Sequence, residues 1–133
     1  MSGAYTAITR GVLIRVRTAY LEDQSDPEES TWVWAYEVRI ENQGKEAVQL
    51  LRRTWRITDA RGRVQVVEGP GVVGQQPKLE PGEAFEYTSG TPLTTSSGFM
   101  SGAYHMVAAC GEAFDAAIPA FSLDSPDPQS RLH

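Results

Sequence analysis

The chain has 133 residues, a formal net charge of −5 and a pI near 5.0, and 41% of its residues are hydrophobic. This length suits one compact domain that buries roughly two-thirds of its unfolded surface. The acidic balance argues against a nucleic-acid partner and an anionic membrane, because both are bound through clustered Lys and Arg. Cys110 is the only cysteine, which excludes an intrachain disulfide and a cysteine-based zinc site and indicates a reducing compartment.

The N-terminal ten residues lack the basic segment and the apolar run of a signal peptide. No uninterrupted apolar stretch approaches the length that spans a bilayer. We therefore expect a soluble, cytoplasmic protein.

Two segments near the N-terminus alternate apolar and polar residues, which is the pattern of half-buried strands. The first runs from Val12 to about Tyr20, and the second covers residues 31–43. One face of the second carries three aromatic and two branched side chains: Trp32, Trp34, Tyr36, Val38 and Ile40. We expect the two strands to pair antiparallel, with the acidic segment 22–30 as an exposed loop between them.

The centre of the chain predicts a hairpin. The apolar positions of residues 47–59 change parity, so we expect a β-bulge at residues 50–52 that keeps both halves facing the core. Residues 59–63 then predict a turn into a strand at 64–67.

The pattern weakens after a glycine-rich string at residues 69–74. A turn precedes a short predicted strand at 84–88, and the Ser, Thr and Gly content of residues 89–102 predicts a loop. Two further strands are expected at 103–109 and 113–118.

About seven short strands with no helical pattern predict an all-β sandwich of the immunoglobulin or fibronectin type III kind over residues 1–124. A closed barrel is the structural alternative. Residues 125–133 predict a polar C-terminal tail.

The string at residues 69–74 has the G-x-G-x-x-G spacing of dinucleotide-binding loops, in which a helix follows the glycines. Here Pro77 and Pro81 prevent a helix, so a Rossmann site is excluded. The favoured interpretation is a loop that turns the chain between strands, since glycines in β proteins commonly supply positive φ.

An anion site is the alternative interpretation of the same string. Successive amides of Gly69, Gly71 and Gly74 could form a concave phosphate nest, although Pro70 removes one N–H. Five arginines of the predicted central hairpin could face such a ligand or balance the acidic loop: Arg52, Arg53, Arg56, Arg61 and Arg63.

No catalytic or metal site is predicted. There is no G-x-S-x-G motif, and the two histidines are His105 and the terminal His133. We expect His105 to be a strand residue rather than a general base, because no triad geometry can be proposed around it. The carboxylates of residues 22–30 match no calcium loop and predict a solvated acidic segment.

The long string over residues 67–90 closely resembles the signature of the bacterial ApaG family. Three further segments extend the match: Arg53–Asp59, Gly98–Val107 and Ile118–Phe121. The resemblance implies a small cytoplasmic protein with a fibronectin type III-like sandwich and no enzymatic activity or cofactor. It also implies an association with cobalt tolerance and magnesium efflux, and related eukaryotic domains look like protein-binding modules.

The family's glycine motif is suspected of binding pyrophosphate, which the resemblance carries over to Gly69, Gly71 and Gly74. Pro70 and Gln75 depart from the family pattern, which has acidic residues there. Our leading hypothesis is a non-enzymatic interaction module that binds a protein through the glycine loop and the loop at 89–102. The competing hypothesis is a protein that binds pyrophosphate or a nucleotide polyphosphate through these glycines and Arg53, with or without a divalent cation.

Overall fold

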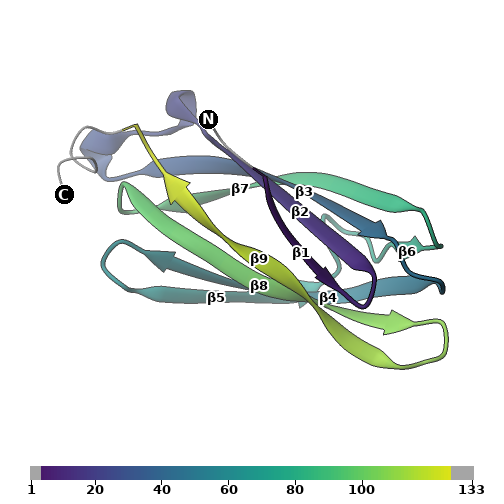
Figure 1. Cartoon of the computed structure of the whole chain (residues 1–133). Coiled ribbons are helices and arrows are strands. Elements are labelled where there is room, and N and C mark those ends of the chain that lie inside the picture. The colour runs from purple at the N-terminus through teal and green to yellow at the C-terminus, as the bar shows by residue number, and fades with distance from the viewer. Residues whose placement is uncertain (1–3, 127–133) are drawn as a thin grey trace.

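The computed structural model describes residues 4–126, which form two antiparallel sheets packed as a sandwich (Figure 1). The first sheet has the order β1 (Tyr5–Thr9), β2 (Val12–Tyr20), β3 (Trp32–Asn42) and β7 (Ala84–Leu93). The second has the order β5 (Val64–Pro70), β4 (Val48–Asp59), β8 (Ser97–Ala108) and β9 (Ala113–Asp124), and β6 (Lys78–Leu79) also pairs with β4. The sandwich prediction is confirmed. The described strands number nine rather than seven; the two additional strands are β1, which pairs with β2, and the two-residue β6, which pairs with β4.

Several local predictions are confirmed. β2 and β3 pair antiparallel, with Val16 opposite Val38, and the register of β4 against β8 shifts between Leu50 and Arg52, where the bulge was expected. The Asp59 amide donates to the Arg63 carbonyl and closes the predicted turn into β5. The segment between β2 and β3 is exposed, although it contains two single-turn 3₁₀ helices, η1 (Glu22–Gln24) and η2 (Pro27–Glu29).

The predicted loop at residues 89–102 is wrong, because β7 continues to Leu93 and β8 begins at Ser97. The glycines of this segment allow β8 to pack closely against β4 and do not indicate a flexible loop. A Cβ on Gly98 would lie 2.4 Å from the Thr58 carbonyl oxygen, and one on Gly102 would lie 2.1 Å from that of Thr54. Glycine is therefore required for β8 to lie against β4.

The C-terminal strand is longer than predicted. β9 runs to Asp124, past a register shift opposite Met100 and Gly102 that interrupts its alternation. Ser125, assigned to the tail from sequence, is buried, and its amide donates to the Ser96 carbonyl. The remainder of the predicted tail, from residue 127, lies outside the described residues. No described helix has the length and apolar character needed to cross a membrane.

An aromatic cluster fills the middle of the sandwich. Trp55 of β4 is 3% exposed and packs edge-on against Tyr36, Tyr104 and Phe121, with ring centroids 5.2, 6.3 and 5.9 Å apart. The buried hydroxyls of Tyr87 and Tyr104 are 2.5 Å apart and join β7 to β8 across the two sheets. The core thus holds the sheets together through rings and one polar pair.

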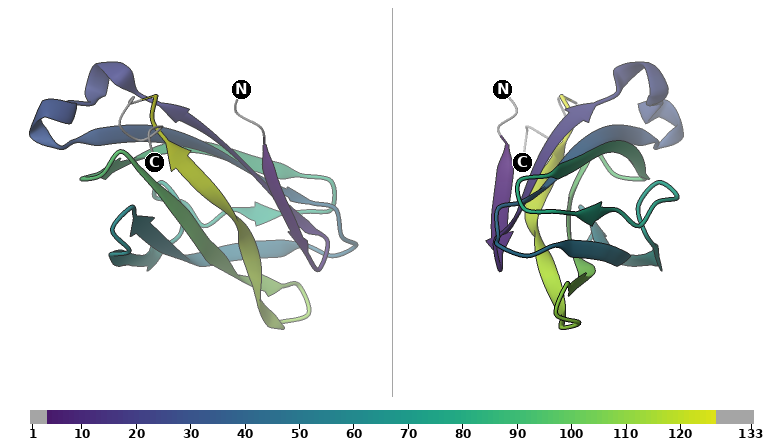
Figure 2. Two further views of the ribbon diagram at one scale, coloured as in Figure 1. Left: turned by 60° about the vertical axis from the view of Figure 1, so that its left-hand side comes forward. Right: turned by 90° about the vertical axis from the view of Figure 1, so that its right-hand side faces the viewer.

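The two sides of the sandwich differ. On one side β1 and β9 lie next to each other (Figures 1 and 2). Two hydrogen bonds join them: the Tyr5 hydroxyl bonds to Ser122 Oγ, and the Ala117 amide donates to Thr9 Oγ1. On the other side the sheets end at β5 and β7, which do not pair with each other. This second side, between β5 and β7, is called the open side below.

The tyrosine pair predicts how stability depends on alkaline pH. Burial is the main cause that raises the pKa of both Tyr87 and Tyr104 above the ordinary value of 10. The unfolded chain then loses these protons first, so their contribution to stability is complete below pH 10 and declines above it. Each group adds a slope of up to about 1.4 kcal/mol per pH unit.

Urea unfolding between pH 8 and 11.5 should show this decline. The double variant Tyr87→Phe/Tyr104→Phe removes both phenols together and leaves no unpaired hydroxyl, so its stability should fall less steeply above pH 10. An identical slope in the two proteins would contradict the prediction.

Candidate functional site

Residues 71–75 form a very small hairpin, called the glycine hairpin below. The amides of Val72 and Gln75 each donate to the carbonyl of the other, both at 2.8 Å. The two central residues have positive φ, 43° at Val73 and 80° at Gly74. Positive φ at both central positions is the requirement of a type I′ turn, in which Asn-Gly is the preferred pair.

The glycine hairpin lets one stretch of chain pair with β4 twice. β5 ends at Pro70, and β6 pairs with β4 again from Lys78. Between them the Gly71 amide donates to the Leu51 carbonyl, and the Leu50 amide donates to the Pro77 carbonyl. Residues 71–75 therefore lie in the connection between β5 and β6. For these residues the structure agrees with the favoured interpretation of the glycine string, a loop that turns the chain between strands. Gly69 and Pro70 belong to β5 instead.

One buried side chain and one glycine fix the position and the shape of the hairpin. Val72 is 1% exposed and anchors it in the core. Gly71 has φ of 62°, and a Cβ there would lie 2.2 Å from the Gln75 carbonyl oxygen. Only glycine can therefore occupy position 71 in this backbone conformation.

Arg53 lies across the start of the hairpin. Its Nη1 donates to the carbonyl oxygens of Pro70 at 3.1 Å and Gly71 at 2.8 Å. A Cβ on Gly69 would be 3.0 Å from the same nitrogen, so Gly69 gives the guanidinium room. The structure therefore brings Arg53, Gly69 and Gly71 together, whereas Gly74 lies at the far tip of the hairpin.

This geometry bears on the phosphate hypothesis. The amides of Gly71, Val72 and Gln75 already donate to backbone carbonyls, Pro70 has no N–H, and Arg53 is engaged with two carbonyl oxygens. A phosphate nest needs several converging free amides. Phosphate binding at Gly69, Gly71, Gly74 and Arg53 stays a prediction, and it would require some of these bonds to be exchanged.

A groove runs along the open side. One cavity of about 320 Å³ has Tyr36, Trp55 and Met100 among its lining residues, together with Arg53 and residues 89–92 of β7. A second cavity of about 320 Å³ shares three of its lining residues, Ile57, Gln65 and Pro92. The two cavities are adjacent. They place Arg53, predicted as a phosphate ligand, and Ser89, from the segment predicted as a protein-contact loop, in one concave surface.

His105 has two partners that sequence analysis did not find. Its Nε2 is 2.7 Å from Thr54 Oγ1, and its Nδ1 is 2.7 Å from Asp115 Oδ1. The three residues come from β4, β8 and β9 and are adjacent only through sheet register, which the sequence does not reveal. The order hydroxyl, imidazole, carboxylate is that of a catalytic triad. However, the carboxylate of such a triad is buried, whereas the Asp115 side chain is 66% exposed, and none of the three residues lines either of the two cavities of the groove.

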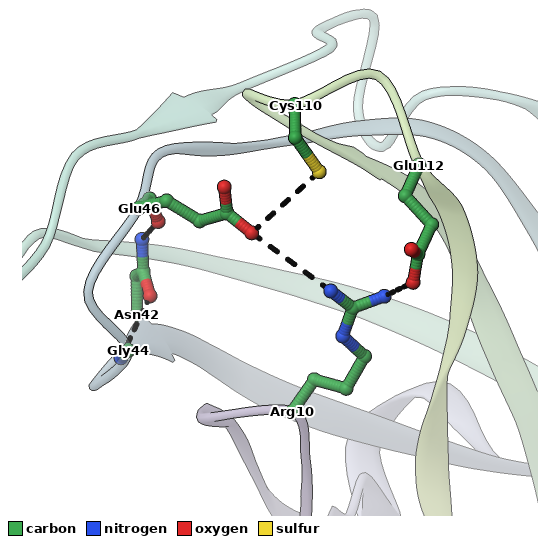
Figure 3. A network of polar contacts seen from close by, with 6 residues as sticks. All are labelled: Arg10, Asn42, Gly44, Glu46, Cys110 and Glu112. Atoms are coloured by element: carbon green, nitrogen blue, oxygen red, sulfur yellow. Dashed lines mark hydrogen bonds and ion pairs between the residues drawn. The ribbon is translucent and has the colours of Figure 1, made fainter.

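A third polar group lies at the end of the sandwich where the β1–β2 and β8–β9 hairpins meet the loop between β3 and β4 (Figure 3). Arg10 forms ion pairs with Glu112 and with Glu46, the latter at 3.8 Å, and its guanidinium is 4.8 Å from the Phe114 ring centroid. The exposed Cys110 thiol is 3.9 Å from Glu46 Oε1. Because one arginine pairs with carboxylates from two other connections, the network ties the β1–β2 and β8–β9 hairpins to the loop between β3 and β4. Within residues 4–126 no group of three or more His, Cys, Asp and Glu side chains could hold a metal ion.

We expect a substitution of Val73 to stabilise the protein. A β-branched residue with φ of 43° is strained, so Val73→Asn, which creates the preferred Asn-Gly pair, should raise the free energy of unfolding by about 1 kcal/mol. Gly74→Ala is the matched control in the same turn. It has open space around its Cβ but φ of 80°, so it should lower stability by about 1–2 kcal/mol. Urea unfolding measures both, and a loss of stability in Val73→Asn would contradict the argument.

Taken together, the fold defines a class: an antiparallel sandwich of the fibronectin type III kind that carries a core-anchored glycine hairpin. The family model of the ApaG domain matches residues 22–108, and the chain belongs to the ApaG family. Protein ApaG from Rhodospirillum centenum is 65% identical over 96% of this chain and 98% of its own length, and Protein ApaG from Paramagnetospirillum magneticum is 60% identical over 97% and 99%. A crystal structure of an ApaA protein from Bordetella pertussis matches with a TM-score of 0.85 and 49% identity, covering 87% of this chain and 94% of that one.

Proposed function

We propose that the protein is a non-enzymatic module of the ApaG type that binds another protein in the cytoplasm. Its contact surface consists of the glycine hairpin and the groove of the open side. The observation that carries the proposal is Val73, which is 57% exposed although it is apolar and strained. Strain of this kind is found where function requires a particular side chain at a particular place.

The rest of the surface supports the same proposal. The groove is concave, has aromatic side chains at its base and an arginine at one end, and such residues commonly anchor protein interfaces. The rigid sandwich on both sides fixes the geometry of the hairpin, which is how many β-sandwich domains present their contact loops. We propose that the link to cobalt tolerance and magnesium efflux acts through the bound partner.

The experiment compares immobilised wild type, Val73→Asn and Arg17→Glu as baits in a native lysate, with captured proteins quantified by mass spectrometry. Arg17 is exposed on β2, in the other sheet, and is the surface control. We expect a protein captured by wild type and Arg17→Glu whose recovery falls at least tenfold with Val73→Asn. If Val73→Asn captures the same proteins in the same amounts as wild type, the glycine hairpin is not part of the contact surface.

Calorimetric titration separates this function from the competing one. Pyrophosphate and ATP, with and without Mg²⁺ or Co²⁺, should give no saturable heat at millimolar ligand. Saturable heat that Arg53→Gln reduces would instead favour a phosphate-binding protein.

A further inference from the structure

We propose that β5 accepts an extended acidic segment of the partner protein as an additional strand, with alternate apolar side chains of that segment entering the groove of the open side. This inference deepens the proposed function and rests on it. It names the recognition mode and the chemistry of the partner segment, and it is carried by the hydrogen bonds, exposure and charge of β5.

The free edge of β5 offers a regular set of backbone groups. The pairs Asp59 with Arg63 and Leu51 with Gly71 are hydrogen-bonded between β4 and the β5 segment. Hydrogen-bonded pairs recur at every second residue of an antiparallel ladder. The amides and carbonyls of Val64, Val66 and Glu68 therefore point away from β4, and among residues 4–126 no other strand pairs with them.

This edge lacks the usual protection. Sheet edges are commonly blocked by proline, lysine or a covering segment. β1 and β9 lie against each other, and β7 carries Pro92. By contrast, β5 has no proline before its last residue, and its outer face carries Val64 at 53% and Val66 at 49% exposure.

The groove beside β5 fits the side chains of an added strand. Side chains of a strand alternate between faces, so every second residue of the segment would point inward beside Gln65 and Val67. The two adjacent cavities, each of about 320 Å³, lie there, with Trp55 and Met100 at the base of one. The two cavities therefore offer adjacent places for apolar side chains of the added segment.

Charge selects an acidic segment. The β4–β5 hairpin carries five arginines and only two carboxylates, Asp59 and Glu68, in a chain whose net charge is −5. Asp59 and Arg63 both line the groove, and the Asp59 carboxylate already accepts from the amides of Arg61 and Arg63. The facing residues of β7 at 89–92 carry no charge. Of the two carboxylates, Glu68 is 3.7 Å from Arg52, whereas Arg56, Arg61 and Arg63 form no ion pair with a described carboxylate.

The probe for the test is a fluorescein-labelled octapeptide of alternating Glu and Val, and the same peptide with Lys in place of Glu is its control. Fluorescence anisotropy with the full chain should show saturable binding of the acidic peptide that weakens with salt. The lysine peptide should bind at least tenfold more weakly. Equal binding of both peptides would overturn the choice of an acidic segment.

Val66→Pro tests strand addition. Its amide faces the free edge, so proline removes a donor for the added strand and none for β4. Val66→Thr keeps the amide and the branched shape. We expect at least a tenfold loss of peptide affinity for Val66→Pro and less than a threefold change for Val66→Thr, whereas equal losses would overturn strand addition.

A second pair of variants does not depend on the folding of Val66→Pro. Arg63→Glu and Arg17→Glu change the net charge by the same amount, on the hairpin and on the other sheet. Only Arg63→Glu should weaken the acidic peptide at least fivefold, and equal effects of the two would overturn the charge argument.

Amide hydrogen exchange gives the direct signature. The amides of Val64, Val66 and Glu68 should exchange fast in the free protein and become protected by the peptide, while Gln65 and Val67 are protected throughout. Protection that instead grows with protein concentration alone would mean that a second copy occupies the edge, and would overturn the proposal. If the lysate partner depends on Val73 but not on Val66→Pro, protein binding stands and strand addition falls.

Discussion

Gly102→Ala is expected to lower the free energy of unfolding by at least about 4 kcal/mol, or to prevent folding. The added Cβ would lie 2.1 Å from the Thr54 carbonyl oxygen and 3.2 Å from its carbonyl carbon. These atoms belong to the backbone of β4, so no side-chain rotation relieves the contact. Since Gly102 lies opposite Trp55 in the β4–β8 pairing and beside a register shift in β9, displacement of β8 would disturb the core.

Gly90→Ala is the matched control for this substitution. Gly90 also lies within a strand, has no positive φ, and its Cβ would meet only the Trp34 carbonyl oxygen at an ordinary 3.4 Å. Its stability should change by less than about 0.5 kcal/mol. Urea unfolding followed by circular dichroism compares the two, and a Gly102→Ala protein as stable as Gly90→Ala would refute the steric argument.

Gly102 also shows where sequence reasoning about the fold succeeded and where it failed. The alternation in β3 and the parity change in β4 depend on side-chain burial, which a single segment of sequence records directly. The glycines of β8 depend on the distance between two strands, which no single segment records. A loop was therefore predicted at 89–102 where two strands lie.

In the candidate site, too, features set within one segment of sequence could be predicted, and features set by contacts between strands could not. The positions of Gly71 and Gly74 predicted a turn, because positive φ is a local property of the chain. The contact of Arg53 with the Gly71 carbonyl and the alignment of Thr54 with His105 and Asp115 depend on the register between neighbouring strands of one sheet. The free edge of β5 could not be predicted from the sequence either, because an edge strand is defined by the order of strands in the sheet.

The glycine motif consequently has two parts with different meanings. Gly71 is fixed by sterics, because its Cβ would meet the Gln75 carbonyl, and Gly74 by its φ of 80°. Val73 between them is the residue that the turn itself disfavours. The motif is thus explained as backbone geometry, and the exposed residue within it remains available for recognition.

Trp55→Ala is expected to lower the free energy of unfolding by about 3–5 kcal/mol. Trp55 is 3% exposed and is the one ring in contact with Tyr36, Tyr104 and Phe121, which come from both sheets. Truncation would remove all three ring contacts and leave a large cavity at the base of the groove. Because Trp55 also lines the groove, water can enter this cavity, which places the expected loss nearer the lower end of the range.

Trp55→Phe is the control, since it keeps a ring in the cluster and should lose roughly half as much stability. The melting temperature of Trp55→Ala should fall by roughly 10–20 °C, measured by circular dichroism at a single protein concentration.

Trp55→Ala also distinguishes the role of Trp55 in the core from its role in the groove. Below its transition, Trp55→Ala keeps the hydrogen-bonding edge of β5 but loses the floor against which an inward apolar side chain would pack. We therefore expect the Glu-Val peptide to bind it at least threefold more weakly, while the amides of Val64 and Val66 still gain protection when the peptide is bound. Unchanged affinity would mean that the side chains of the added strand do not reach Trp55.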